Sequence, residues 1–180
     1  MRVITGSARG RKLRTLEGMD VRPTTDKVKE AMFSAIQFQL PGSYVLDLFA
    51  GSGQLGIEAL SRGAAHAVFV DLSPRSIAVV RENLESTGFT EASTLVLKSQ
   101  MDFLRTTDQR FDLAFLDPPY RKGILEETLP VLSEYMNPEG IVVCEMETEL
   151  TLPEKIGRLD LKKTYKYGKI KVVMYSVNNS

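Results

Sequence analysis

One stretch, residues 44–56, constrains the fold of this chain more than any other. It reads Tyr-Val-Leu-Asp-Leu-Phe-Ala-Gly-Ser-Gly-Gln-Leu-Gly, an apolar run with one carboxylate that breaks into closely spaced glycines and continues with apolar residues at helical spacing. This order predicts a buried strand, a tight turn and a helix. Glycines suit such a turn because any Cβ would occupy the space where a ligand lies against the backbone. We therefore expect the turn to bind a ligand.

Two classes of ligand fit this glycine turn. Gly51, Gly53 and Gly56 match the dinucleotide-binding fingerprint, and Asp71 follows Gly51 by 20 residues, where an acid would hold a ribose hydroxyl. S-adenosylmethionine also needs a glycine turn and a ribose-binding acid, but it brings no pyrophosphate. Asp47 favours S-adenosylmethionine, because a carboxylate attracts its ammonium and sulfonium groups and would repel a pyrophosphate. An ordinary strand-to-helix turn would not require these glycines and acids together.

The composition limits the classes of protein. With 180 residues, of which 43% are hydrophobic and 26% charged, we expect one main soluble domain. No apolar run approaches the ~18 residues of a membrane span, and the start has no apolar signal-peptide core, which predicts a cytoplasmic protein. The single cysteine, Cys144, lies in an apolar run and fits a buried thiol. The single histidine, His66, makes a histidine-based metal site or a serine–histidine triad hard to build, so we expect no metal.

The net charge is zero, but it is unevenly distributed. Residues 1–30 carry a net charge of +4, residues 155–180 carry +6, and the middle carries −10. We expect the two basic ends to come together as a surface for a polyanion. Residues 2–16 read as a small β-hairpin, part of a basic N-terminal unit of residues 1–21 that precedes a main domain of residues 22–180. The alternative is that this hairpin is only a solvated edge.

Strand-like and helix-like segments alternate along the main domain. A helix over 26–40 precedes the strand of the glycine turn and could cover the ligand site. Further strands are expected at 67–71, 94–98, 111–116, 141–145, 158–163 and 165–177. The alternation predicts an α/β fold with a doubly wound, mostly parallel, seven-stranded sheet that is Rossmann-like. In such sheets ligands bind outside the carboxyl ends of the strands, where the strand order reverses.

Residues at these strand ends are the candidates for cofactor binding. Asp71 ends one strand and is followed by Leu72, and after the next strand an adenine ring could lie on Met101 with its amine near a polar side chain. The complete set of candidates is Asp47, Phe49, Gly51, Ser52, Gly53, Asp71, Leu72, Gln100, Met101 and Asp117.

The strand at 111–116 runs directly into Asp117-Pro118-Pro119-Tyr120, the candidate catalytic residues. The exocyclic amine of a nucleobase is a poor nucleophile, because its lone pair is delocalised into the ring, so it must be held with that pair aimed at the methyl group. The Asp117 carboxylate and the Pro118 carbonyl can accept its two hydrogens, and the consecutive prolines fix that carbonyl. Tyr120 offers a stacking face for an extruded base. Catalysis would then rest on positioning and electrostatics. The structural alternative is a proline-stiffened turn.

Three segments together resemble the RsmD family of bacterial methyltransferases, which act on a guanine N2 of small-subunit ribosomal RNA. They are residues 47–63, residues 117–120 and the Arg-Pro-Thr-Thr-Asp-Lys-Val-Lys-Glu run of residues 22–30. The likeness covers nearly the whole chain. It implies a class I methyltransferase fold, S-adenosyl-L-methionine as cofactor and 16S rRNA as acceptor, free or within an assembling 30S particle, and we expect a monomer with no membrane partner. The RNA-binding candidates are Arg9, Arg11, Lys12, Arg14, Arg22 and Thr24.

Two residues depart from the family pattern. Gln54 stands where relatives usually have a small residue such as alanine, and Gln100 stands where an acid is expected near the adenine amine. The amide carbonyl of Gln100 can still accept a hydrogen bond, so we expect cofactor binding to be retained.

Three other functions stay open. An amino-methyltransferase acting on DNA adenine N6 or on a protein glutamine shares the Asp-Pro-Pro-Tyr motif, although 180 residues leave little room for a DNA target-recognition domain. An NAD-dependent oxidoreductase would need a substrate domain and a proton-transfer group. A non-catalytic RNA-binding module would not need both Asp117 and Tyr120.

Overall fold

The computed structural model describes residues 1–16, 25–120 and 123–178, and every structural statement refers to these ranges. The helices are α1 (Asp26–Ala35), α2 (Gln54–Ser61), α3 (Pro74–Thr87), α4 (Gln100–Thr106) and α5 (Ile124–Ser133), with a short 3₁₀ helix at Thr90–Ala92. The strands are β1 (Tyr44–Asp47), β2 (His66–Asp71), β3 (Ser93–Leu97), β4 (Phe111–Leu116), β5 (Met136–Glu147), β6 (Lys155–Ile156), β7 (Leu159–Tyr167) and β8 (Ile170–Val177).

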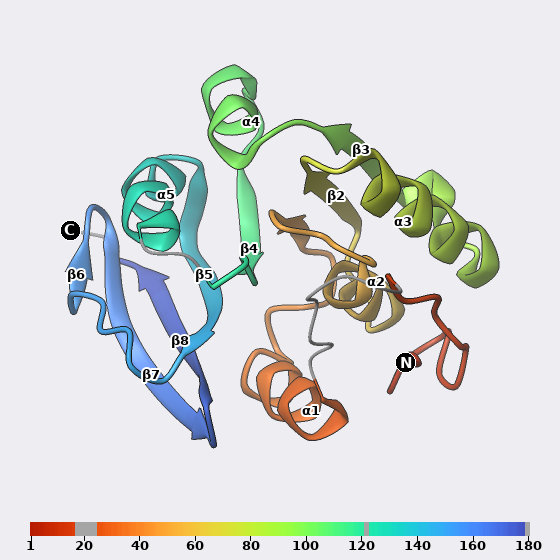
Figure 1. Ribbon diagram of the computed structural model, residues 1–180, viewed down its shortest axis with the longest axis horizontal. Coiled ribbons are helices and arrows are strands. Elements are labelled where there is room, and N and C mark those ends of the chain that lie inside the picture. Colours follow the sequence, from red (N-terminus) through yellow and green to blue (C-terminus); the bar gives the residue numbers. More distant parts are fainter. Residues whose placement is uncertain (17–24, 121–122, 179–180) are drawn as a thin grey trace.

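The strands form one mixed sheet in the order β3-β2-β1-β4-β5-β8-β7-β6 (Figure 1). Strands β1 to β5 pair in parallel, and β6, β7 and β8 add an antiparallel extension. The chain moves outward from β1 to β3 and then returns to place β4 on the other side of β1. The strand order therefore reverses between β1 and β4, as the alternating pattern predicted.

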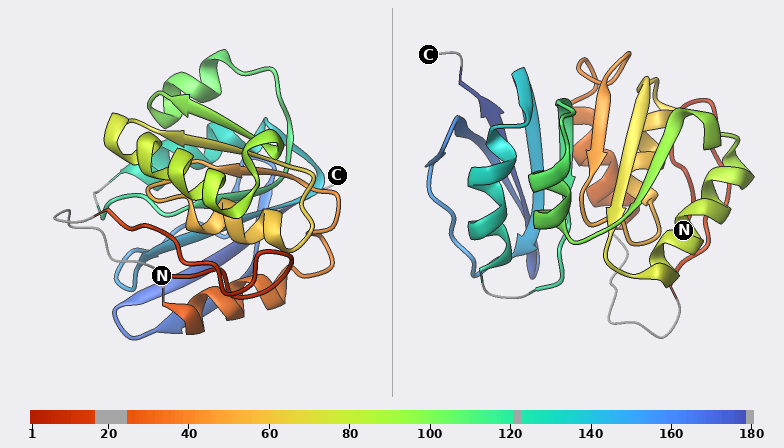
Figure 2. Two further views of the ribbon diagram at one scale, coloured as in Figure 1. Left: turned by 90° about the vertical axis from the view of Figure 1, so that its right-hand side faces the viewer. Right: turned by 90° about the horizontal axis from the view of Figure 1, so that it is seen from above.

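Helices cover both faces of the sheet, which explains why its central strands are almost wholly apolar. Leu113 and Phe115 of β4 pack in a core with α1, α2 and α3, whereas Ala114 and Leu116 pack in a second core with α4 and α5. The two layers lie on either side of the strands (Figure 2). Strand alternation thus sends neighbouring side chains into separate cores.

The prediction of seven strands is wrong by one. The eighth strand, β6, has only two residues, which pair antiparallel with Asp160 and Leu159 of β7. A two-residue strand carries too little hydrophobic alternation to be detected in the sequence.

The expected N-terminal β-hairpin is reduced to a short antiparallel pairing without strands, in which the Val3 N–H donates to the Arg11 carbonyl and the Leu13 N–H donates to the Met1 carbonyl, both at 2.9 Å. Residues 1–16 contain one isolated antiparallel bridge, between Arg2 and Lys12, and no strand. The N–H groups of Ile4 and Thr5 donate to the buried Glu58 carboxylate of α2, at 2.8 and 3.1 Å. Side chains of α2 therefore take backbone donors that a hairpin would have used in its own ladder.

Of the described residues in the two basic ends, residues 1–16 and the C-terminal strands lie apart (Figure 1). The N-terminal segment lies at one end of the long axis and β6, β7 and β8 lie at the other, with α1 between them (Figures 1 and 2). In the described ranges, no helix has both the length and the hydropathy needed to cross a bilayer.

Candidate active site

The carboxyl ends of β2, β1 and β4 meet at one rim of the sheet. Asp47 ends β1, in register with Phe69 of β2 and Phe115 of β4. The Leu48 N–H donates to the Phe115 carbonyl at 3.1 Å, and the Ala50 N–H donates to the Val70 carbonyl at 2.9 Å. These bonds extend the ladder past β1 and fix the start of the glycine loop at the point where the strand order reverses.

Each of the three glycines in this loop has its own structural reason. Gly51 and Gly53 have φ values of 56° and 84°, a left-handed backbone that other residues rarely adopt. Gly56 lies within α2, where a Cβ would stand 2.3 Å from the Phe69 ring. The first two glycines shape the turn, and the third allows the helix to approach the sheet.

Asp71 links the end of β2 to this loop. Its Oδ2 accepts the N–H of Gly51 at 2.9 Å, and its Oδ1 accepts the N–H of Ser73 at 2.9 Å. Each carboxylate oxygen has a second lone pair, so Asp71 can also accept two vicinal ribose hydroxyls. The same side chain can therefore shape the loop and bind the cofactor.

Asp47 lies beneath the loop and is only 2% exposed. Its Oδ2 accepts the Gly56 N–H at 3.0 Å. Burial, and to a smaller extent the negative charge of Asp71, raise the pKa of Asp47 to about 7, against the opposing effect of the Gly56 hydrogen bond. A nearby cation would favour the charged carboxylate, so the site suits a positively charged ligand.

An apolar platform lies beside Asp71. Leu72 is 72% exposed, and Leu97, which was not singled out from the sequence, is 52% exposed and in register with Asp71. Exposed leucines at the ends of neighbouring strands suit the face of an adenine ring. Gln100 and Met101 follow as the first residues of α4, an element that was not predicted from the sequence, and the Gln100 amide donates to Glu127 of α5 at 3.4 Å.

The remaining cofactor candidates lie within the loop. Phe49 is half-buried and packs against the second core. Ser52 is buried, and its carbonyl accepts a hydrogen bond from Asn83 of α3 at 2.8 Å. Gln54 is also buried, and its Oε1 has no hydrogen-bond partner among the described residues.

The Asp-Pro-Pro-Tyr segment follows β4 directly. Asp117 is half-buried, Pro118 is buried, Pro119 is exposed and Tyr120 is 43% exposed. The structure thus brings this segment to the same rim as the glycine loop and leaves the Tyr120 ring accessible for stacking.

A further carboxylate reaches this rim from β5. The register of β4 and β5 ends with Leu116 opposite Cys144, so Asp117 and Glu145 come next on neighbouring strands. Glu145 is only 5% exposed. The sequence pattern placed Glu145 in the strand but indicated no role for it, because only the register shows which residue lies beside Asp117.

The N-terminal RNA-binding candidates differ in their surroundings. Arg9, Arg11 and Lys12, here named the basic turn, are exposed. Arg14 instead forms an ion pair with Glu82 of α3. The neighbouring Ser7 and Ala8 bond to Ser61, at the end of α2 away from the glycine loop. Arg22 and Thr24 lie outside the described residues.

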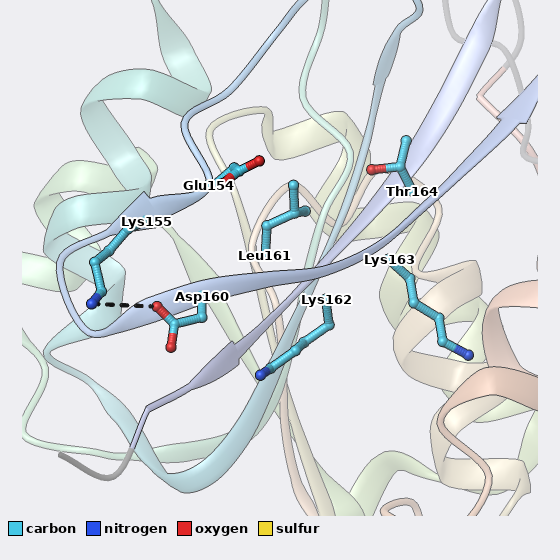
Figure 3. Close-up of a pocket in the computed structure, with 7 residues that line it drawn as sticks. All are labelled: Glu154, Lys155, Asp160, Leu161, Lys162, Lys163 and Thr164. Carbon is cyan, nitrogen blue, oxygen red and sulfur yellow. Dashed lines mark ion pairs between the residues drawn. The ribbon is translucent and has the colours of Figure 1, made fainter.

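A hollow of about 490 Å³ lies at the opposite edge of the sheet, along β6 and β7 (Figure 3). Lys155, Lys162 and Lys163, here named the far-edge lysines, line it, and Lys155 pairs with Asp160 at 3.9 Å. Asp160 is in register with Ser176 of β8, which is in register with Ile141 of β5. The sheet order places β5 and β8 between β4 and β7, so this hollow is separate from the rim where β2, β1 and β4 end.

Comparison with known proteins adds independent evidence. The chain is 41% identical over 180 residues to "Putative rRNA methyltransferase YlbH" of Bacillus subtilis, covering 97% of this chain and 98% of that protein. It is 34% identical over 177 residues to ribosomal RNA small subunit methyltransferase D of Escherichia coli, covering 97% and 89%. The solved structure titled "Putative methyltransferase yhhF from Escherichia coli" superimposes with a TM-score of 0.90 at 34% identity, covering 100% of this chain and 99% of that one.

A family model described as conserved hypothetical protein 95 matches residues 1–176. The match spans the N-terminal segment, the glycine loop, the Asp-Pro-Pro-Tyr segment and all eight strands except the last residue of β8. The resemblance to RsmD and the identity to YlbH agree with this match. The chain therefore belongs to this family.

Proposed function

We propose that the protein transfers a methyl group from S-adenosyl-L-methionine to the exocyclic N2 of a guanine in 16S rRNA. One observation carries the proposal: the glycine loop with Asp47 and the Asp-Pro-Pro-Tyr segment with Asp117 follow adjacent parallel strands at the reversal of strand order. In this proposal the first serves as the donor pocket and the second as the acceptor-binding segment, side by side. The choice of rRNA is supported by the names of the relatives, which are rRNA methyltransferases.

In this proposal the glycine loop and the end of β2 bind the methyl donor. Asp71 accepts the ribose hydroxyls, and the platform of Leu72 and Leu97 supports the adenine, with Gln100 and Met101 at its edge. Asp47 supplies negative charge below the loop for the cationic amino-acid end. When bound, S-adenosylmethionine supplies an electrophilic methyl group on a sulfonium.

The Asp-Pro-Pro-Tyr segment holds the acceptor. The Asp117 carboxylate and the Pro118 carbonyl accept the hydrogens of the exocyclic amine, which turns its lone pair towards the methyl group. Tyr120 stacks on the extruded base. The new nitrogen–carbon bond forms as the sulfur–carbon bond breaks, and a proton on nitrogen can leave to Asp117.

The test is methyl transfer from tritiated S-adenosylmethionine to RNA from cells that lack the protein, with parallel arms containing DNA and protein from the same cells. We expect label in 16S rRNA at the N2 of one guanine, located by nuclease digestion and chromatography. Label in DNA or protein alone would refute the choice of acceptor.

The matched variant is Asp117→Ala. We expect it to bind S-adenosylhomocysteine with near-parental affinity but to lose most single-turnover methylation, on the order of a hundredfold or more, because the amine is no longer positioned. A parental single-turnover rate in this variant would refute the positioning role.

A further inference from the structure

Besides Asp71 on β2, three carboxylates follow one another on the neighbouring strands β1, β4 and β5 of the rim. Asp47 lies on β1, Asp117 follows β4 and Glu145 lies on β5, and these strands are adjacent in the order β1-β4-β5. Neighbouring strands are about 4.8 Å apart, so a molecule the size of a purine can contact the ends of β4 and β5 together. The proposed function uses Asp47 and Asp117 but assigns nothing to Glu145.

The direction of Glu145 follows from strand alternation. Val45 of β1, Phe115 of β4 and Val143 of β5 all pack in the core beneath α1, α2 and α3. Side chains two positions further along point to the same face, which assigns Asp47, Asp117 and Glu145 to that face. The hydrogen bond from Gly56 of α2 to Asp47 agrees with this assignment.

The surroundings of Glu145 distinguish it from the acids that follow. Glu145 is 5% exposed, Glu147 is half-buried and Glu149 is exposed. Glu145 has an interaction within the protein, and a carboxylate with about four acceptor positions can serve a ligand as well.

Aromatic side chains continue the same face beyond Glu145. Val172 of β8 is in register with Glu145 on one side and with Tyr165 of β7 on the other. Tyr165 and Tyr167 are half-buried and pack against the same core as Val172. The side chains next to Glu145 on this face are therefore apolar and aromatic.

We infer that Glu145 accepts the N1–H of the target guanine and thereby selects guanine over adenine, an inference that rests on the proposed function. The Watson–Crick edge of guanine places N1–H beside the exocyclic N2 amine, so two adjacent donors face the rim. With the amine held by Asp117 and Pro118, the next acceptor along the sheet is Glu145. Adenine presents a lone pair at N1, which a carboxylate would repel.

The test uses an RNA oligonucleotide that contains the target guanine, not yet methylated, and a second oligonucleotide with 2-aminopurine at that position. 2-Aminopurine keeps the amine at C2 but has a lone pair in place of the N1–H. Single-turnover rates are measured on both for the parent and for Glu145→Gln, whose amide can donate to that lone pair. Glu147→Gln, two residues further along the same strand, is the matched control.

We expect the parent to methylate guanine at least about tenfold faster than 2-aminopurine, since a carboxylate facing a lone pair loses a charged hydrogen bond. Glu145→Gln should narrow this ratio by about tenfold, and Glu147→Gln should leave it at the parental value. 2-Aminopurine also lacks the O6 atom of guanine. This atom is missing in the assays of the parent and of both variants, so a change in the rate ratio between these enzymes does not come from it.

An unchanged ratio in a folded Glu145→Gln variant would overturn the inference while leaving the proposed function intact. Failure of the parent to methylate 16S rRNA, either free or within ribosomal particles, would instead refute the proposed function and the inference with it. If Glu145→Gln does not fold, the inference is tested with Glu145→Asp, in which the carboxylate is retracted by one methylene. It should lower the rate on guanine at parental affinity for S-adenosylhomocysteine, and a parental rate would overturn the inference.

Discussion

Replacement of Asp47 by asparagine should stabilise the ligand-free protein at pH 8 and weaken its affinity for S-adenosylmethionine. The carboxylate is buried beneath the glycine loop, where burial and the charge of Asp71 disfavour its ionised form. Asparagine removes the charge and keeps an oxygen that can accept the Gly56 N–H. It also removes the negative charge that would face the cationic ligand.

The size of the effect follows from the pKa of Asp47. A rise from 3.8 to about 7 is roughly three units, and at about 1.4 kcal/mol per unit the ionised form at pH 8 costs on the order of 4 kcal/mol. The amide group of the asparagine is buried without an acceptor, which costs about 1–3 kcal/mol and offsets part of this gain. The net stabilisation is therefore about 1–3 kcal/mol, or roughly 2–10 °C in the melting temperature of a chain of this size.

The sign of the pH dependence provides the assay. The folded carboxyl keeps its proton up to about pH 7, whereas in the unfolded chain it loses the proton near pH 4, so this group's contribution to stability falls as the pH rises between these values. Melting temperatures of parent and variant are measured without ligand at pH 5, 6, 7 and 8, and the advantage of Asp47→Asn should grow with pH. Calorimetry should show a larger loss for S-adenosylmethionine than for S-adenosylhomocysteine, which lacks the sulfonium charge.

A difference in melting temperature that does not vary between pH 5 and pH 8 would refute this reasoning, since it would mean that Asp47 is already ionised in the folded protein at pH 5. Equal losses of affinity for the two ligands would separately refute an interaction between Asp47 and the sulfonium.

Three other predictions concern the loop and the surface. Asp71→Ala should lower affinity for S-adenosylhomocysteine by about tenfold to a hundredfold, through loss of a charged acceptor worth about 1.5–3 kcal/mol, and an unchanged affinity in calorimetry would exclude Asp71 from the site. Gly56→Ala should lower the free energy of unfolding by about 1–3 kcal/mol in urea titrations, because its Cβ meets the buried Phe69 ring; an unshifted midpoint would contradict that steric clash. Changing the residues of the basic turn to glutamine should reduce the slope of log RNA affinity against log salt by about 0.7–0.9 for each RNA phosphate that the turn no longer binds. An equal effect from changing the far-edge lysines to glutamine would show that neither surface binds RNA specifically.

The part of the site that could be predicted from the sequence is the part encoded by neighbouring residues. A carboxylate, a glycine turn and a helix follow each other between Asp47 and Ser61, and strand alternation with helices implied the reversal of strand order beside β1. Local patterns sufficed because each of these elements is shaped by its own backbone and burial. The placement of Asp117 next to the loop followed from that fold rule.

What could not be predicted depends on residues far apart in the sequence. The N-terminal hairpin is shorter than predicted because the side chains of Glu58 and Ser61 accept the backbone N–H groups of Ile4 and Ala8. The position of Glu145 beside Asp117 was missed because it follows from the register of β4 and β5. Hydrophobic periodicity reports which residues are buried, but it does not report which buried polar groups meet.

Under the proposed function, the burial of Asp47 also affects how tightly the site binds the cofactor before and after methyl transfer. Before transfer, Asp47 lies below a ligand that carries a sulfonium, and the positive charge favours the ionised carboxylate. After transfer the sulfonium charge is gone, and burial again raises the pKa of Asp47 towards its value of about 7 in the ligand-free protein. The site therefore binds the product less favourably than the substrate by the amount of that missing attraction. The carboxylate that costs stability in the empty site thus gives preference for the methyl donor and favours release of the spent cofactor.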